Sequence, residues 1–239
     1  MSRPRLLLVP QLTELEWQIK PLLEEWADVA SYDAPGVGEE AAVDELTPAA
    51  IAARGLREVE MLGWPDYVVV ADEFGAMAAT QLACAEPGRV AGLAIGHMCL
   101  VNTVEGDRPT INPAVQAAAS QIVVADYRTW ALAMSQATQG GYDEVLADRY
   151  MERVPQELVK HFFAAPKPPS EPLEERLRAL TCPLLFAEHK GCVFHTRDGF
   201  EDAAAAFPNA RTIRVPAKPS TCVEFAGALR EFCRSLNAR

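Results

Sequence analysis

Two adjacent carboxylates, Asp72 and Glu73, are the first residues of the chain with an evident chemical use. They follow the apolar run 67–70, which is typical of a buried strand, and they precede the small-residue stretch 77–84, which is typical of a closely packed helix. A carboxyl group at the base of an apolar pocket has its charged form disfavoured, so its pKa rises toward neutrality, and a second carboxylate facing the same space raises it further. Such a group can donate or accept a proton during catalysis, so this turn predicts general acid–base chemistry.

The residues around this turn keep the frame of a nucleophile elbow. Residues 71–75 read Ala-Asp-Glu-Phe-Gly where the elbow reads G-x-S-x-G, so Glu73 stands in the place of the nucleophile. Upstream, residues 5–12 read as a strand followed by a loop, and residues 33–38 form a D-x-P-G-x-G turn. With these motifs the chain resembles the α/β-hydrolase superfamily over nearly its whole length. The resemblance implies an α/β-hydrolase fold, with a mostly parallel central sheet, flanking helices and a helical lid.

Strand and helix signals alternate along the chain, as expected for a mostly parallel sheet that is covered on both faces. A helix is expected at 17–26, after the first strand and its loop. The segments that suit strands of this sheet are 5–9, 28–33, 67–70, 90–95, 183–187 and 211–215.

Between about 104 and 172 the alternation stops, and helices are expected at 112–124, 127–138, 142–150 and 155–163. The resemblance identifies this stretch as the lid that family members insert after the strand following the elbow helix. We therefore expect a core of residues 1–103 and 173–239, with the lid of residues 104–172 inserted into it. A pocket between the lid and the edge of the sheet is the expected binding site.

The positions of the remaining catalytic residues follow from the same resemblance. Cys192 stands where the family has its triad acid, and Ser220, or else Thr221, stands where the family has its histidine. Acyl transfer by a triad needs a nucleophile, a base that takes its proton and an acid that orients the base. With Glu73, Cys192 and Ser220 in those three places, an ordinary serine esterase is not expected.

The loop after the first strand departs from the family pattern as well, because Pro10 and Gln11 stand where His-Gly is common. Backbone N–H groups of Leu12 and Phe74 are the expected donors of an oxyanion hole. Such donors keep their value for stabilising developing negative charge even where a triad has been lost.

Three roles are open for Glu73. It can be a carboxylate nucleophile followed by an aromatic residue, as in the dehalogenase and epoxide-hydrolase relatives. It can be a general acid or base in a non-hydrolytic reaction, such as cyclisation, isomerisation, decarboxylation or dehydration of a small, largely apolar carbonyl-containing metabolite. It can also be a structural residue in a catalytically silent relative that binds a small ligand or a protein partner.

Other candidate residues each have a functional and a structural interpretation. His97 ends a strand at the expected pocket rim but also fits a structural histidine, and His195 is a candidate displaced base in the loop past Cys192. His189, in the same loop region, is expected to be solvated. Cys192 is either a nucleophile or a small buried filler. Trp130 belongs to an aromatic set at helical spacing that either packs the lid or forms a ceiling over an apolar ligand.

Composition is consistent with one globular domain that takes a small-molecule substrate or ligand. The chain has 239 residues, 49% of them hydrophobic, which is enough for a large core. The formal net charge of −11 is spread along the sequence and lacks the basic patches of a nucleic-acid binder. The apolar run near the start is too short for a signal peptide, so we expect a cytoplasmic protein that does not enter a membrane. No cofactor is expected, and a homodimer is an open option.

The cysteines show neither a C-x-x-C pair nor metal-ligand spacing, which predicts free buried thiols and no metal site. They stand at positions 84, 99, 182, 192, 222 and 233.

Overall fold

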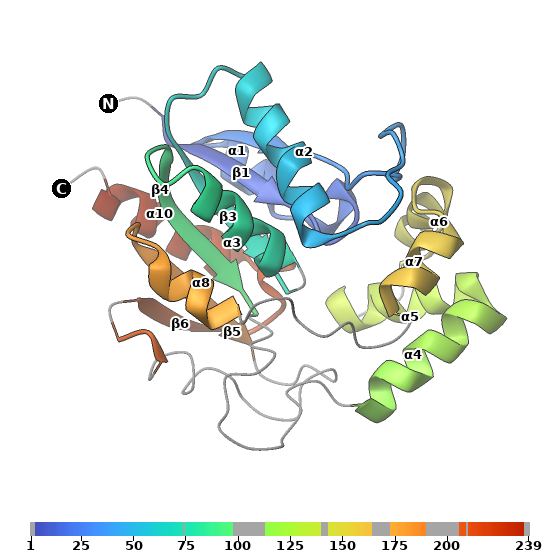
Figure 1. The fold of residues 1–239 in the computed structure, drawn as a ribbon. Helices are drawn as coiled ribbons and strands as arrows, with labels where there is room; N and C mark the ends of the chain where they lie inside the picture. Colours follow the sequence, from blue (N-terminus) through green and yellow to red (C-terminus); the bar gives the residue numbers. More distant parts are fainter. Residues whose placement is uncertain are drawn as a thin grey trace.

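A single parallel sheet forms the centre of the computed structural model (Figure 1). The structure describes residues 3–73, 75–97, 113–139, 143–163, 173–189, 206–208 and 210–236. Within these ranges the strand order is β2-β1-β3-β4-β5-β6, and every neighbouring pair is parallel. The strands are β1 (Arg5–Val9), β2 (Asp28–Ser31), β3 (Tyr67–Asp72), β4 (Val90–Gly96), β5 (Leu184–His189) and β6 (Arg211–Val215). The expected α/β architecture is therefore confirmed, and all six expected strands are present.

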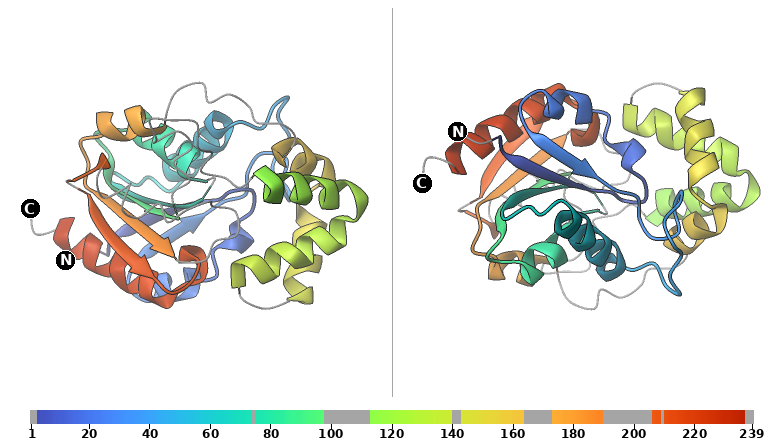
Figure 2. Two further views of the ribbon diagram at one scale, coloured as in Figure 1. Left: turned by 90° about the horizontal axis from the view of Figure 1, so that it is seen from below. Right: turned by 90° about the horizontal axis from the view of Figure 1, so that it is seen from above.

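Helices cover both faces of the sheet because its central strands are apolar on both sides. Successive side chains of a strand point to opposite faces, so Leu7 of β1 packs in one core while Leu6 and Leu8 pack in the other. The first core is closed by α2 (Pro48–Met61), α3 (Gly75–Ala85) and α8 (Leu173–Ala179), and the second by α1 (Lys20–Glu24) and α10 (Val223–Leu236). The two layers of helices are visible on either side of the sheet in Figure 2.

Four further helices pack on one another beside the sheet: α4 (Pro113–Ala125), α5 (Tyr127–Gln139), α6 (Glu144–Arg153) and α7 (Gln156–Phe163). They match the helices expected from the sequence to within a few residues. All views place them at the end of the molecule opposite the two termini (Figures 1 and 2). The Gly38 N–H, in the turn after β2, donates to the Arg153 carbonyl at 2.8 Å, so the group contacts the loops at the carboxyl ends of the strands. Whether it acts as a lid stays a prediction.

The turn between β3 and α3 has the strained backbone of an elbow. Glu73 has a φ of +46°, in the left-handed region that non-glycine residues rarely adopt. Gly75, which opens α3, lies so close to β1 that a Cβ atom there would be 3.1 Å from the Val9 carbonyl oxygen. The helix therefore starts directly against the neighbouring strand, and Glu73 is held at the sharp corner between β3 and α3.

The helix expected at 17–26 is shorter than predicted. Residues Glu14–Glu16 form a 3₁₀ turn that ends at Trp17, and α1 begins only at Lys20. Pro21 explains the difference, because proline has no N–H to donate and its ring clashes with the carbonyl four residues earlier in a helix interior. Proline is tolerated in the first turn, which is where α1 places it.

In the described part of the chain, no helix combines the length and apolar character needed to cross a membrane.

Gly96 is the point where the loop after β6 packs against the end of β4, and its replacement tests that contact. A Cβ atom at Gly96 would lie 2.4 Å from Cβ of Pro219, so we expect Gly96→Ala to lower the free energy of unfolding by about 1–3 kcal/mol. Gly227→Ala is the control, because this exposed position of α10 has no described atom within 4 Å of the added methyl group. Removing a helical glycine there should stabilise the protein by about 0.5–1 kcal/mol. Urea denaturation of both variants measures the difference, and equal effects would contradict the close contact.

Candidate active site

The Glu73 carboxylate lies at the carboxyl end of the central strand β3, between two donors. One of its oxygens, Oε2, accepts a hydrogen bond from Nε2 of Gln11 at 3.0 Å. The same oxygen is 3.4 Å from Nζ of Lys218, which comes from the loop after β6. The side chain of Glu73 retains 12% of its accessible surface, so it is largely but not wholly withdrawn from solvent. A strained turn thus presents a carboxylate at the carboxyl end of the sheet, next to an amide and an ammonium group.

Lys218 carries the positive charge of the site and is itself buried, with 6% of its side chain exposed. Burial on its own lowers the pKa of this amine, but the carboxylates of Glu73, Asp72 and Glu16 together raise it above its ordinary value. The side chain is therefore an ammonium ion at neutral pH. Such a group can stabilise negative charge but cannot accept a proton.

Asp72 lies behind Glu73 in the interior. Burial raises the pKa of Asp72 to about 6, with Lys218 opposing the shift and Glu73 adding to it. Its Oδ2 accepts the backbone N–H of Ser220 at 3.1 Å, whereas Oδ1 has no hydrogen-bond partner among the described residues. Asp72 and Glu73 therefore share one electrostatic environment, as their adjacency in the sequence predicted.

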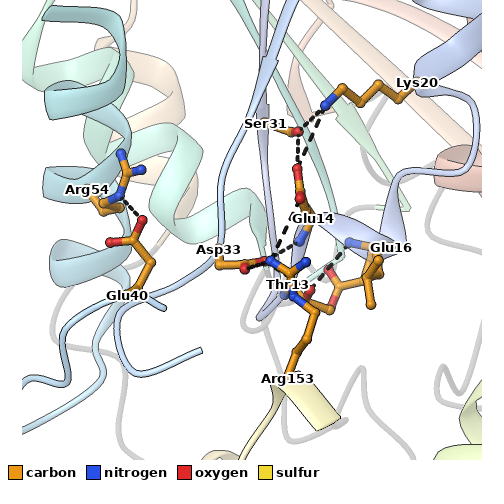
Figure 3. Close-up of polar contacts among 10 residues, drawn as sticks. Thr13, Glu14, Glu16, Lys20, Ser31, Asp33, Glu40, Arg54 and Arg153 are labelled. Carbon is orange, nitrogen blue, oxygen red and sulfur yellow. Dashed lines mark hydrogen bonds and ion pairs between the residues drawn. The ribbon is translucent and has the colours of Figure 1, made fainter. Parts of the chain in front are cut away.

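A third carboxylate, Glu16, is bound by the loop that follows β1 (Figure 3). Its two oxygens accept the backbone N–H groups of Gln11 at 2.8 Å, Leu12 at 3.2 Å and Thr13 at 3.4 Å. Thr13 and Glu16 form a capping box at the start of the 3₁₀ turn. Burial raises the pKa of Glu16 to about 7, against the lowering effects of Lys218 and of the three backbone donors.

This arrangement corrects the expected oxyanion hole. The Leu12 N–H group was expected to face a substrate, but Glu16 already accepts its hydrogen bond. The reason is the Thr-x-x-Glu spacing of residues 13–16, which satisfies the N-terminal amides of the turn with the protein's own carboxylate. That signal was present in the sequence and identifies Glu16. The second expected donor, Phe74, lies outside the described residues.

His97, which is buried, and His189, which is half-buried, form a further group next to the site. His97 was expected at a pocket rim, but it is buried, with a φ of +46° and its Nδ1 3.0 Å from Oε2 of the equally buried Glu188. His189 was expected to be solvated, but its ring centroid lies 4.3 Å from that of His97. Burial, together with His97, lowers the pKa of His189 to about 4. Both residues stand at the carboxyl ends of the neighbouring strands β4 and β5, so their rings meet at the same edge of the sheet.

In the loop after β6, the position expected for Ser220 beside Glu73 is taken by another residue. The side chain that this loop extends to Glu73 belongs to Lys218, two residues earlier, while Ser220 is buried and contacts Asp72 through its backbone. Cys192 and His195 lie outside the described residues, so their expected roles stay predictions.

Trp130 packs in the first core, between Tyr127 at 5.6 Å and Tyr150 at 5.7 Å, measured between ring centroids.

The four described cysteines are free thiols; Cys222 and Cys233 are buried as expected, whereas Cys84 is exposed. Within the described ranges, no three metal-binding side chains cluster in a way that would hold an ion.

The chemistry of the site follows from its charge balance. Glu73, Asp72 and Glu16 interact with the single ammonium of Lys218. Burial in this region of low dielectric constant raises the pKa of Asp72 to about 6 and that of Glu16 to about 7, so Glu16 retains part of its proton at neutral pH. The cluster can therefore supply and accept a proton next to a fixed positive charge.

A parallel sheet covered on both faces, with a strained turn after a central strand, agrees with the α/β-hydrolase fold, and the match to solved structures shows that the chain has this fold. Solved structures of similar fold include an enol-lactonase from Burkholderia xenovorans LB400, with a TM-score of 0.73 and 16% identity over 100% of this chain and 93% of that chain. They also include the thioesterase domain from the curacin biosynthetic pathway, with a TM-score of 0.67 and 16% identity over 97% of this chain and 91% of that chain. A third is a carboxylesterase from Nitrososphaera gargenis, with a TM-score of 0.69 and 14% identity over 99% of this chain and 92% of that chain. No protein-family model and no curated protein matches the sequence.

The raised pKa of Glu16 predicts a pH dependence of stability. Because the folded-state pKa of about 7 exceeds the ordinary value of 4.5, the folded protein binds this proton more tightly, and stability falls as pH rises between these values. The loss is on the order of a few kcal/mol. Glu16→Gln cannot ionise, so its thermal midpoint should fall less than that of the wild type between pH 5 and pH 8. The exposed Glu25→Gln variant is the control and should follow the wild type. Parallel curves for all three proteins would refute the assignment.

Proposed function

We propose that the chain is a non-hydrolytic α/β-hydrolase-fold enzyme that moves a proton at carbon in a small, largely apolar carbonyl compound. The observation that carries the proposal is the position of Glu73, a partly exposed carboxylate on a strained turn, beside the buried ammonium of Lys218. A carboxylate base next to a fixed positive charge suits reactions in which a C–H bond breaks and negative charge develops on a neighbouring oxygen.

In the proposed reaction Glu73 accepts a proton from the carbon next to the carbonyl group. The electron pair of the C–H bond moves into the carbonyl to give an enolate, and the ammonium of Lys218 stabilises its charge. Isomerisation follows when Glu73 returns the proton to a different carbon, and dehydration follows when the enolate expels a hydroxyl group that takes up the proton. Gln11 holds the carboxylate in place throughout, through its hydrogen bond to Oε2.

The fold neighbours favour hydrolysis as a reaction type, since those named above are a lactonase, a thioesterase and a carboxylesterase. The charge states of two described neighbours of Glu73 favour the other assignment. If Glu73 formed an ester with a substrate, a base would have to activate the water that cleaves it. Lys218 is protonated at neutral pH, and a pKa of about 4 makes His189 a weak base.

A catalytically silent binding protein is the second candidate. It is favoured by the contacts that bind Glu73 and the loop internally: Gln11 and Lys218 share one Glu73 oxygen, and Glu16 accepts the loop amides. In that case the cluster is a structural ion network and no carbon–hydrogen exchange occurs. The following experiment separates the two candidates.

Glu73→Gln should abolish proton exchange while leaving the fold intact, because glutamine keeps the shape and an acceptor oxygen but cannot take a proton. The assay incubates the protein in D₂O with a panel of small apolar ketones and lactones and follows exchange of the α-hydrogens by ¹H NMR. Loss of a positioned base should reduce the rate by on the order of a hundred- to ten-thousand-fold. Lys218→Met should also lower the rate, and Glu25→Gln should not. Exchange that persists in Glu73→Gln, or no exchange in the wild type across the panel, would leave the binding protein as the better account.

Hydrolysis is tested separately with activated short-chain esters and a serine-directed fluorophosphonate probe. Glutamate in the place of the nucleophilic serine should give neither turnover above background nor labelling. Intact-mass spectrometry detects any adduct. Stoichiometric labelling of a serine would show that a serine nucleophile is present and would overturn the non-hydrolytic assignment.

A further inference from the structure

Arg153, the last residue of α6, joins the outer helices to the sheet. Its guanidinium Nη2 donates to Oδ2 of Asp33 and lies 3.7 Å from Oε1 of Glu14 (Figure 3). Its backbone carbonyl accepts the Gly38 N–H. Asp33, Glu14 and Arg153 also line a surface hollow of about 540 Å³, so solvent reaches the outer side of this contact. One side of the contact therefore faces solvent, and the other side is buried.

Asp33 forms the buried side of the contact, with only 6% of its surface exposed. Its second oxygen, Oδ1, accepts the Thr13 hydroxyl at 3.0 Å and the Glu14 N–H at 2.9 Å. One buried carboxylate thus binds α6 with one oxygen and the loop after β1 with the other.

The contacts continue from this loop to the candidate active site. Thr13 and Glu16 form the capping box, Glu16 accepts the N–H of Gln11, and the Gln11 side chain donates to Glu73. Hydrogen bonds thus lead from Arg153 through Asp33 to Thr13, and from Glu16 through Gln11 to the Glu73 carboxylate. The capping box of one short turn joins Thr13 to Glu16.

Gly38 leaves the space in which the first of these contacts forms. A Cβ atom at Gly38 would lie 2.9 Å from Oδ2 of Asp33 and 3.3 Å from Nη2 of Arg153, and the residue has a φ of +59°. The D-x-P-G-x-G turn therefore places both the carboxylate, at its first position, and the room for the arginine, at its last.

We propose that Arg153 is a positioning residue: docking of α6 through Arg153 and Asp33 fixes the loop of residues 11–13, and through Gln11 it fixes the orientation of Glu73. This inference rests on the proposed function in taking Glu73 as the reacting group. It adds that the outer helices control that group, so undocking of α6 releases the loop and lets the carboxylate move.

The test is Arg153→Met, which keeps much of the side-chain length and removes the charge and its hydrogen bonds, with Arg149→Met on the exposed face of the same helix as the matched control. NMR on the substrate-free full chain measures amide hydrogen exchange at residues 11–13 and the chemical shift of the Gln11 side-chain amide protons. We expect exchange in the loop to accelerate by about tenfold or more in Arg153→Met and the Gln11 amide protons to move upfield as their bond to Glu73 weakens. Arg149→Met should leave both unchanged, and Arg153→Lys should restore part of the protection.

Asp33→Asn supplies the coupling test. If Arg153 acts through Asp33, adding Arg153→Met to Asp33→Asn should cause no further acceleration. The inference is overturned if loop exchange in Arg153→Met equals wild type, if Arg149→Met accelerates it as much, or if the β3 amides accelerate equally, which would indicate general loss of stability. Should Arg153→Met fail to fold, Arg153→Lys and Asp33→Asn report the same loop. Because no substrate is present, this outcome is independent of the ketone-exchange assay, so failure of one proposal is distinguishable from failure of the other.

Discussion

The buried ammonium of Lys218 is the interaction on which the rest of the site depends. An ion withdrawn from water is costly unless opposite charges and hydrogen bonds surround it, and here Glu73, Asp72 and Glu16 supply the opposite charges. The dependence is mutual, because Lys218 also lowers the pKa of Asp72 and Glu16, which burial alone would raise further. Removing the lysine would leave three carboxyl groups without their common positive charge, so the ionisation of all three depends on this one side chain.

The backbone geometry that brings these groups together is a property of the parallel sheet. The carboxyl ends of parallel strands lie along one edge, where ligands bind in open α/β sheets. Glu73 follows β3, His97 follows β4, and Lys218 comes from the loop after β6. Two of these positions, Glu73 and His97, have positive φ angles, so the turns that present side chains to this edge hold backbone strain. Such strain persists only where the surrounding packing over-determines it, as the close approach of Gly96 to Pro219 illustrates.

A fold shared with esterases, lactonases and thioesterases restricts where chemistry happens more than which chemistry happens. The elbow delivers a side chain to one place, and the charge state of its neighbours decides the reaction. In the proposed function, the protonated Lys218 and the weakly basic His189 suit the stabilisation of an anion better than the activation of water. In our proposal the outer helices add a second level of control, since Arg153 of α6 binds Asp33, and Asp33 accepts the Thr13 hydroxyl in the loop that orients Glu73.

The apolar runs of strand length, separated by helical patterns, predicted the strands and a doubly covered parallel sheet, and the resemblance to the α/β-hydrolase superfamily predicted the elbow and the class of fold. The sequence also identified Asp72 and Glu73, since two carboxylates at the end of a buried strand are costly unless used or paired. It overestimated the helix at 17–26, where Pro21 limits the start, although that rule was readable from the residue itself.

What only the tertiary structure decided is which charges meet. Lys218 and Glu73 are 145 residues apart, and nothing in the spacing of either residue indicates the other. The same holds for Arg153 and Asp33, 120 residues apart. A pattern within one segment reports how that segment folds, whereas a pKa or an ion pair depends on distances between segments and on burial. Both of these are fixed only when the strands have taken their places in the sheet.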